Sequence, residues 1–517
     1  MVELEAARDD IDTSDHLSMA EAFQKCFIAN GAKLKIVDFV NTKLTIAVAP
    51  SVAHKNGTLL AQDQTGGAYA YMVVDYTEST KQTVYGFAYY AGGATAFDTT
   101  HSVTDPAAGG GSAFTPATVT ATPHWRTWTV QATIGTTEYG TMPEKAYLVC
   151  RYRNRVVLSG NPGEPYQWYM SRSGNPYDWK YAVNDAGSPV KGGNSDAGVM
   201  GDIIKALIPH KDDYLVFGCA GSMWVLFGDP MDGGQLRSFD SNTGIFCPTS
   251  WCWGPDGELY FWGKDGIYRA TVPGVPTLIS RIRLPRLVSD ENASNLTHRI
   301  SMIYDASRAG IVISVTKLAD GSNSNYFYSF AAVDGEAKIG GFFPETYPAA
   351  CAVYSGLHYE SGDKTLDGVL VGCTDGYIRR YDEAAKSDDG GAADVAINSY
   401  TTIGPLALGD GQRKEGSIES IDLTVATGVA STDADSDDVA YKVFVARSAA
   451  DAIKSAKANT APRLGGTFKG PGNFRGSSRR QSASGLYGII RLENITLDES
   501  WAFETLFVDG SLSGKAK

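Results

Sequence analysis

Short apolar runs separated by glycine-bearing turns recur along the middle of the chain. Each unit is an apolar strand, a turn, and a second apolar strand that ends in an aromatic or basic residue. The pattern predicts hairpins over residues 146–160, 213–230, 257–270, 298–315, 325–343 and 368–382. A hairpin roughly every 40 to 60 residues is typical of propeller blades. We therefore predict a β-propeller over residues 142–386.

The N-terminal part changes character twice. Residues 1–22 are acidic and polar, and they predict a tail with one helical turn around Met19–Ala22. Residues 23–50 contain a hairpin with Asn30-Gly31 at its turn, and we assign them to the propeller. Residues 51–141 are rich in Thr, Ala, Gly and Tyr and predict an inserted β subdomain. Within it, alternation over Arg126–Ile134 indicates small antiparallel strands.

Residues 387–517 follow a charged, glycine-rich break at 386–398. Their strands are longer and alternate cleanly, with one face to bury. They are expected over residues 417–427, 438–448, 487–497 and 501–511. This pattern predicts a C-terminal β-sandwich, or a further sheet packed on the propeller. Residues 449–458 predict one short helix, or a loop of helical character. The predicted fold class is all-β.

Composition agrees with many short strands and turns. The chain has 517 residues, and its 57 Gly exceed the ordinary share of about 7%. The formal net charge of −13 argues against a free-standing nucleic-acid binder, which would carry a basic face. An acidic protein can still border DNA that must slide past without adhering. The six tryptophans expected to serve packing are Trp168, Trp179, Trp224, Trp251, Trp253 and Trp262.

Cysteine usage and hydropathy point to a protein made in a reducing cytoplasm. The seven Cys form no disulfide framework, and Cys247 and Cys252 have no nearby His to complete a zinc site. No signal-peptide pattern opens the chain, and no run reaches the roughly 18 apolar residues of a membrane span. We expect no membrane span.

No residue pattern points to catalysis, a cofactor or a metal. The chain has no nucleophile elbow and no phosphate-binding loop, and its seven His are isolated. The acidic stretch 431–440 lacks the offsets of a calcium loop and is expected to be a solvated loop. Arg479 and Arg480 lie in a small-residue loop that is solvated, or that meets a phosphate or a partner's carboxylate.

Paired carboxylates would mark a propeller glycosidase. Asp256, Asp265, Asp375 and Asp382 lie in or beside hairpin turns, where Asp ordinarily bonds its own backbone. We predict structural roles for these four residues.

Residues 151–181 contain nearly the same turn twice. Ser159-Gly160-Asn161-Pro162 is repeated as Ser173-Gly174-Asn175-Pro176, with a short aromatic strand between them. Asn-Pro favours turn initiation, and Gly provides the needed backbone freedom. The stretch predicts one blade-forming unit.

The order of these motifs resembles the tail hub or nozzle proteins of tailed bacteriophages, also called packaged-DNA stabilisation proteins. The resemblance covers about residues 23–50 and 145–385. The two hairpins that carry the resemblance are residues 214–228 and 257–269. Its turn motif is met by Ser171, Gly174, Asn175, Pro176 and Trp179. Residues 51–141 and 387–517 depart from the family's pattern.

The resemblance implies a non-enzymatic virion protein of the phage tail, synthesised in the host cytoplasm. Such proteins form a homohexameric ring below portal and adaptor, which lines or closes the DNA channel and retains the genome until ejection. The implied partners are further copies of the chain, adaptor or portal-proximal tail proteins, tail fibre or distal tail proteins, and DNA in transient, non-specific passage. The unmatched segments are expected to reach neighbouring subunits. The alternatives are a propeller that binds or cleaves receptor glycans, and a periplasmic or cell-surface propeller.

Overall fold

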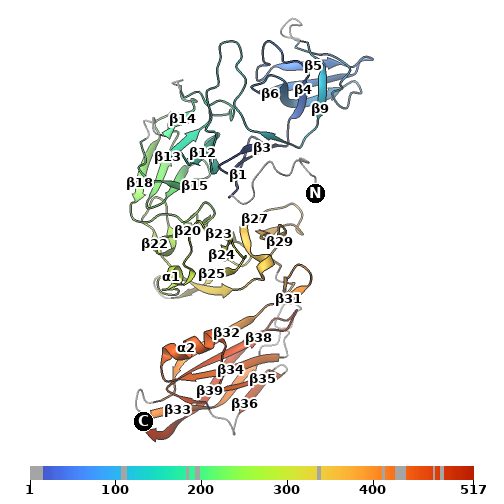
Figure 1. The fold of residues 1–517 in the computed structure, drawn as a ribbon. Helices are drawn as coiled ribbons and strands as arrows, with labels where there is room; N and C mark the ends of the chain where they lie inside the picture. Colours follow the sequence, from blue (N-terminus) through green and yellow to red (C-terminus); the bar gives the residue numbers. More distant parts are fainter. Residues whose placement is uncertain are drawn as a thin grey trace. The chain divides into compact units, whose positions relative to one another are not determined.

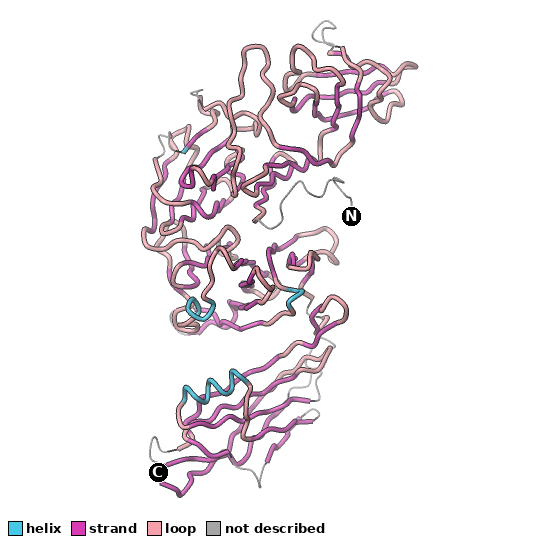
Figure 2. The backbone as a smooth tube through the Cα atoms, in the orientation of Figure 1, coloured by secondary structure: helices cyan, strands magenta, loops and turns pink. Residues whose placement is uncertain are grey.

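The computed structural model describes residues 16–105, 113–181, 185–192, 198–334, 339–382, 384–409, 414–425, 438–469, 472–477 and 483–516. The chain divides into two compact units, residues 1–295 and 296–517. Strands dominate both units (Figures 1 and 2). The helical elements given by the described residues are α1 (Leu287–Glu291), α2 (Ala449–Ala458) and the 3₁₀ turn η4 (Ala349–Cys351). The predicted all-β class is confirmed.

The first unit contains four four-stranded antiparallel sheets, three of them built from consecutive strands. The first sheet is β1 (Ser18–Ala22), β2 (Lys25–Ala29), β3 (Leu34–Asp38) and β10 (His124–Thr127). The second is β11 (Leu148–Tyr152), β12 (Arg155–Asn161), β13 (Glu164–Met170) and β14 (Val190–Lys191). The third is β15 (Ile204–His210), β16 (Tyr214–Cys219), β17 (Met223–Phe227) and β18 (Gln235–Asp240). The fourth is β19 (Trp251–Trp253), β20 (Leu259–Gly263), β21 (Gly266–Ala270) and β22 (Thr277–Leu278).

Consecutive sheets pack face to face. In β12, Val156 and Leu158 join one buried core with the first sheet, while Val157 faces another core that it shares with Phe217 of the third sheet. Alternate residues of a strand point to opposite faces, so both faces must be apolar. That explains why these strands read as continuous apolar runs. Four-stranded meanders stacked in this way are blades of the β-propeller type, as predicted.

The second unit continues the pattern. The hairpins predicted at 298–315 and 325–343 form one sheet rather than two separate units. That sheet is β23 (His298–Asp305), β24 (Gly310–Lys317), β25 (Asn323–Asp334) and β26 (Ile339–Glu345). A three-stranded sheet follows, made of β27 (Val353–Tyr359), β28 (Gly368–Cys373) and β29 (Ile378–Arg380). The charged break then contains a small hairpin, β30 (Ser387–Asp389) and β31 (Asp394–Ala396).

A six-stranded sheet is inserted between β3 and β10. Its strand order is β8 (Val103–Thr104), β5 (Leu59–Asp63), β6 (Tyr69–Thr77), β7 (Thr83–Ala91), β4 (Thr42–Ile46) and β9 (Pro116–Thr120). Sheet membership therefore differs from the predicted segment 51–141 at both ends. β4 pairs inside the insertion, and β10 returns to the first sheet. Strands β4 and β10 pair with strands that are distant in sequence, so the local hydrophobic pattern did not predict their sheets.

The C-terminal residues form two facing sheets. The first is β32 (Ser399–Ala407), β38 (Tyr487–Asn494), β34 (Asp438–Ala446) and β35 (Leu464–Lys469). The second is β36 (Gly472–Ser477), β33 (Lys414–Val425) and β37 (Ala483–Gly485), with β39 (Phe503–Ala516) also paired to β33. Side chains such as Leu423 and Leu492 share one buried core between the two sheets. This core makes the region a β-sandwich.

Helix α2 covers one sheet of the sandwich and has the predicted bounds. The Ser448 hydroxyl accepts a hydrogen bond from the Asp451 N–H at 3.1 Å, which is a standard N-cap. Ala452 and Ala456 are buried against Phe444. The helix is therefore fixed by its cap and by a small-residue face.

Two N-terminal predictions are wrong. Residues 18–22 form strand β1 rather than a tail with a helical turn, because Phe23 and Gln24 take left-handed φ angles of 53° and 59° and reverse the chain onto β2. In the stretch predicted as strands over Arg126–Ile134, only β10 is a strand. Beyond β10, backbone N–H groups donate hydrogen bonds to the carbonyls of Leu34, Tyr177 and Thr77. This segment therefore connects the first sheet to the insertion.

Candidate functional site

The repeated turn of residues 151–181 surrounds a buried arginine. Arg155, fully buried at the start of β12, makes a bidentate ion pair with Asp229 at 2.9 and 3.1 Å. Its remaining N–H groups donate to the carbonyls of Ser171, Ser188 and Ala186 at 2.9, 2.6 and 3.0 Å. Because Asp229 follows β17 of the third sheet, this guanidinium fastens the second sheet to the third.

The two turns themselves are similar in backbone geometry. Gly160 and Gly174 both have φ of 75°, a value that favours glycine. The side chains of Asn161 and Asn175 each accept a hydrogen bond from the backbone N–H two residues ahead. The tryptophans pack as predicted. Trp168, Trp179 and Trp262 are buried, and three more pack against apolar clusters, namely Trp224, Trp251 and Trp253.

A second buried arginine, Arg126, attaches the inserted sheet to the first sheet. The guanidinium of Arg126 in β10 lies 4.6, 4.2 and 5.2 Å from the ring centres of Tyr76, Tyr85 and Tyr177. It also donates to the Tyr177 hydroxyl at 2.6 Å and to Asp38 at 3.3 Å. Tyr76 and Tyr85 belong to the insertion, and burial raises the pKa of Tyr76 to about 12. The cation therefore joins the insertion to the first sheet. We call these contacts of Arg126 with Asp38 and the three tyrosines the Arg126 joint.

Polar contacts complete this joint. The Asn41 amide donates to Asp38 at 3.0 Å and to Asp75 at 2.8 Å, and Lys25 pairs with Asp75 at 3.2 Å. Burial alone would raise the pKa of Asp38. The Arg126 charge and the Asn41 backbone N–H outweigh that burial, and the pKa is lowered. Asp38 is therefore an ionised, buried group at the base of the insertion.

The same face of the inserted sheet continues beyond the joint and becomes exposed. We call its outer half the aromatic face, made of Leu59, Tyr71, Val73, Phe87 and Tyr89. Phe87 is 55% and Tyr89 41% exposed, with Leu59 and Val73 at 37% and 39%. The strand register places Val73 opposite Phe87 and Tyr71 opposite Tyr89, whose rings stack at 4.9 Å. One side of this sheet thus presents contiguous apolar surface to solvent.

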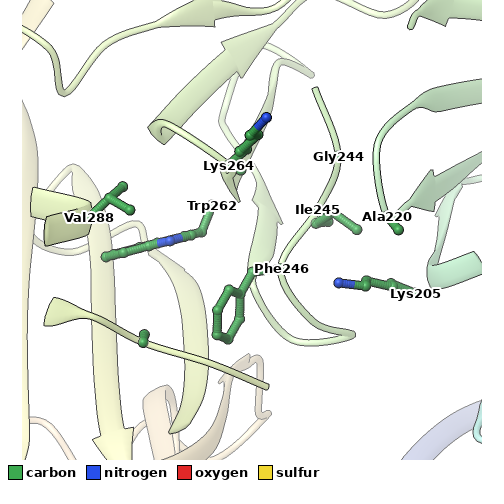
Figure 3. A pocket seen from close by; sticks show the side chains of 10 residues that line it. Lys205, Ala220, Gly244, Ile245, Phe246, Trp262, Lys264 and Val288 are labelled. Carbon is green, nitrogen blue, oxygen red and sulfur yellow. The ribbon is translucent and has the colours of Figure 1, made fainter. Parts of the chain in front are cut away.

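A pocket of about 210 Å³ lies in the first unit, beside the third and fourth sheets (Figure 3). Lys205 of β15 and Lys264 of the β20–β21 turn line it, with Phe246 and the buried Trp262 as aromatic wall. Its other lining residues are Ala220, Gly244, Ile245, Gly263, Val288 and Ala293. None of the ten is acidic.

The lysines of this pocket are not neutralised by a contact. Within the described ranges, neither Lys205 nor Lys264 has an ion pair or a side-chain hydrogen bond. Asp202 is the acidic group whose pKa Lys205 helps to lower. Its carboxylate already accepts from Ile203 N–H, Gly221 N–H and the Ser222 hydroxyl at 2.7, 2.9 and 2.7 Å. The pocket therefore has a net positive lining.

The four hairpin carboxylates are bound within, or exposed on, their own hairpins. Asp375 accepts from the Tyr377 N–H and pairs with Arg379 at 2.7 Å, and Asp382 accepts from the Ala384 N–H at 3.0 Å. Asp265 accepts from the Tyr268 hydroxyl at 3.2 Å. Asp256 lies exposed in the turn between β19 and β20. These contacts match the predicted structural roles for Asp265, Asp375 and Asp382.

The described residues hold no group of three or more His, Cys, Asp or Glu arranged to bind a metal. None of the seven cysteines forms a disulfide, and burial raises the pKa of Cys219 to about 12. Most of the acidic stretch 431–440, as well as Arg479 and Arg480, lies outside the described residues. No helix in the described ranges has the length and apolar character needed to cross a bilayer.

Sequence reasoning did not single out Arg126, the aromatic face or the pocket. An arginine in a threonine-rich alternating stretch reads as solvated, and only the convergence of three distant tyrosines buries it. The aromatic face did have a signal. In YAYMVV, residues 69–74, both sets of alternate positions are apolar or aromatic, which is unusual for a sheet with one face in water.

Comparison with known proteins gives no match to any protein-family model and none to curated protein sequences. Solved structures do match. A streptogramin B lyase is 9% identical with a TM-score of 0.27, covering 66% of this chain and 87% of that one. The extracellular domain of a putative hybrid two-component system from Bacteroides thetaiotaomicron is 8% identical with a TM-score of 0.32, covering 81% and 44%. A putative 6-phosphogluconolactonase from Bacteroides uniformis is 11% identical with a TM-score of 0.28, covering 71% and 93%. These likenesses carry no argument about activity.

Proposed function

We propose that this protein is a structural component of a bacteriophage tail, of the hub or nozzle kind. In this proposal, six copies form a ring below portal and adaptor, and the ring lines or closes the DNA channel and retains the genome until ejection. The chain has a structural role and catalyses no reaction. Its working location is the virion tail, after synthesis in the host cytoplasm.

The observation that carries the proposal is the aromatic face on a firmly mounted insertion. Contiguous exposed apolar surface on a soluble protein marks a contact site. Here it lies on a sheet whose other half is fixed by the Arg126 joint. The inserted sheet is held at one half by buried contacts and exposes apolar side chains at the other half. Such a sheet suits a contact with another subunit or partner in a closed assembly.

Two further observations support it. The turn motif that resembles the phage family, Ser171 to Trp179, ends β13 and enters the core between the first and second sheets. The family's two hairpins likewise form the centres of the third and fourth sheets. The net charge of −13 suits a channel wall along which DNA slides without adhering.

The proposal is tested in phage particles that carry variants of this chain. Phe87→Glu places a charge on the aromatic face, whereas Val275→Glu places one on an exposed loop site outside that face, where the side chain is 80% exposed. We expect Phe87→Glu to remove the chain from purified particles, as measured by mass spectrometry, and Val275→Glu to leave its amount unchanged. Wild-type particles that lack the chain altogether would contradict the proposal.

A second candidate is a receptor-recognition protein that binds glycans, because exposed tyrosines often stack against sugars. The geometry favours it less, since Tyr71 and Tyr89 use their ring faces on each other at 4.9 Å with an interplanar angle of 15°. Binding of the purified chain to host polysaccharide, lost in Tyr89→Ala, would promote this candidate.

A further inference from the structure

We propose that the pocket lined by Lys205 and Lys264 binds a carboxylate group of a partner polypeptide, together with an apolar side chain next to that carboxylate. This site is independent of the tail assignment and of the aromatic face. It would make the third and fourth sheets a recognition surface as well as blades.

The side chains around the pocket define the chemistry of its ligand. Three of them carry hydrogen-bond donors, namely Lys205, Lys264 and Trp262, and none of the ten carries an acceptor. Among the described residues, the indole N–H of Trp262 has no hydrogen-bond partner, and both amines lack an ion pair. Side chains that offer only donors, two of them cationic, favour an anionic acceptor.

The apolar half of the pocket narrows the class of ligand. Phe246 and Ile245 line it together with Val288, which is itself 38% exposed, so an apolar group beside the anion would be covered. Figure 3 shows the amine of Lys205 directed toward the side of Phe246. A bare inorganic anion would leave this apolar wall unused. A carboxylate next to an aromatic or aliphatic side chain would contact both the lysine amines and the apolar wall.

Size and net charge favour a polypeptide over other sources of an anion. A volume of about 210 Å³ is below the roughly 300–1,000 Å³ of small-molecule sites, and it suits one or two inserted side chains. A nucleic acid would bring a long polyanion toward a chain of net charge −13, which is repulsive outside the pocket. The carboxylate comes from an acidic side chain or from a chain terminus.

The test measures how fast single lysines of the intact protein are reductively methylated, by mass spectrometry, with and without small probes. N-acetyl-phenylalanyl-glutamate amide carries a side-chain carboxylate, and N-acetyl-alanyl-phenylalanine carries a terminal one. The neutral control is N-acetyl-phenylalanyl-glutamine amide, and inorganic phosphate tests the bare anion. Lys211 is the control lysine, since it is exposed at the β15–β16 turn and does not line the pocket.

We expect at least one carboxylate probe to slow methylation of Lys205 and Lys264 but not of Lys211. The better of the two probes then identifies the source as a side chain or a terminus. In Lys205→Gln, protection of Lys264 should need about two- to five-fold more probe, the effect of one exposed ion pair. Lys211→Gln should leave the titration unchanged, and circular dichroism checks the folding of each variant.

Three results would overturn the inference. The glutamine probe could protect as well as the glutamate probe, which would make the contact purely apolar. Phosphate could protect at the same concentration as the peptides, which would make the apolar wall irrelevant. All probes could fail to protect either lysine, which would leave no site.

Discussion

Arg155 and Arg126 are both buried cations in the first unit, yet they are held in opposite ways. Arg155 has a carboxylate and several carbonyls around its guanidinium, with a partner for each of its nitrogen atoms. Arg126 has one carboxylate, one hydroxyl and three tyrosine rings, while its Nε and Nη1 find no acceptor among the described residues. One joint is made by directional hydrogen bonds and the other largely by ring faces.

The two arginines hold their neighbouring sheets by different kinds of contact. Blade-to-blade packing fixes neighbouring sheets in register, and a guanidinium with fixed acceptors specifies one geometry. A cation between aromatic faces is attracted over a broader range of positions. The inserted sheet is therefore held to the first sheet largely by ring contacts around Arg126, with fewer directional bonds than Arg155 makes between the second and third sheets.

The largest expected effect comes from Arg155→Leu. It leaves Asp229 without its partner and unpairs several buried carbonyls, so it should lower the free energy of unfolding by about 4 kcal/mol. Hydrogen exchange of peptides from β11 to β17, measured by mass spectrometry, reports the local loss. Unchanged exchange in this variant would mean that the Arg155–Asp229 ion pair does not hold the second and third sheets together.

Arg126→Met should cost less, about 2 kcal/mol. It leaves Asp38 buried and charged, but Asn41 and two backbone N–H groups still bond to that carboxylate, and two unpaired donors disappear. Peptides from β3, β6 and β10 should lose protection, while those from β16 and β17 should not. The double variant Arg126→Met/Asp38→Asn should recover part of the loss. Equal costs for Arg126→Met and Arg155→Leu would remove the contrast between the joints.

Two conservative changes measure what the tyrosine hydroxyls contribute while the rings around Arg126 are kept. Tyr177→Phe keeps the ring but removes the acceptor 2.6 Å from Arg126, and we expect a loss of about 1 kcal/mol. Tyr85→Phe also keeps its ring over Arg126 and removes only a bond to Glu78, so it should cost about 0.5 kcal/mol. Calorimetry on both variants checks the order, and the reverse order would show that the Tyr177 hydroxyl contributes less to stability than the bond between Tyr85 and Glu78.

Acid should loosen the Arg126 joint through Asp38. The lowered pKa of this carboxyl means that the unfolded chain binds a proton more readily than the folded one. The stabilisation is therefore complete above the unfolded pKa, about 3.9, and is lost as pH falls toward the folded pKa. Hydrogen exchange in β3 and β6 should rise over that window in the wild type. In Asp38→Asn the rise should shrink, and an unchanged rise would assign it to other groups.

The smallest effect on stability is expected at the aromatic face. Phe87→Ser should change the free energy of unfolding by less than about 0.5 kcal/mol, because the side chain is mostly in water. Thermal unfolding of the purified chain measures it. A loss comparable to that of Arg126→Met would mean that Phe87 supports the fold rather than a contact with another molecule.

Local signals in the sequence were enough for much of the fold. The hairpins at 213–230 and 257–270 and the helix at 449–458 follow from turns, caps and periodicity, which are short-range properties. The pairing of β1 with β2 was not visible, because its turn uses Phe23 and Gln24 in conformations that usually favour glycine. Strand β10 was also misjudged, since its partner β3 lies on the far side of the insertion.

The sites depend even more on long-range convergence. Arg126 is buried only because tyrosines from β6, β7 and the second turn motif meet around it. Lys205 and Lys264 come from different sheets, and nothing in either local sequence marks them as neighbours. The expectation that no catalytic cofactor is needed remains a prediction.

Electron microscopy of the intact particle that contains this chain distinguishes a tail hub from a peripheral fibre. We expect six copies in a closed ring around the tail axis, with each inserted sheet in contact through Phe87 and Tyr89 and a net acidic surface toward the lumen. Finding the chain instead as peripheral trimers, the usual form of a receptor-binding fibre, would contradict this expectation.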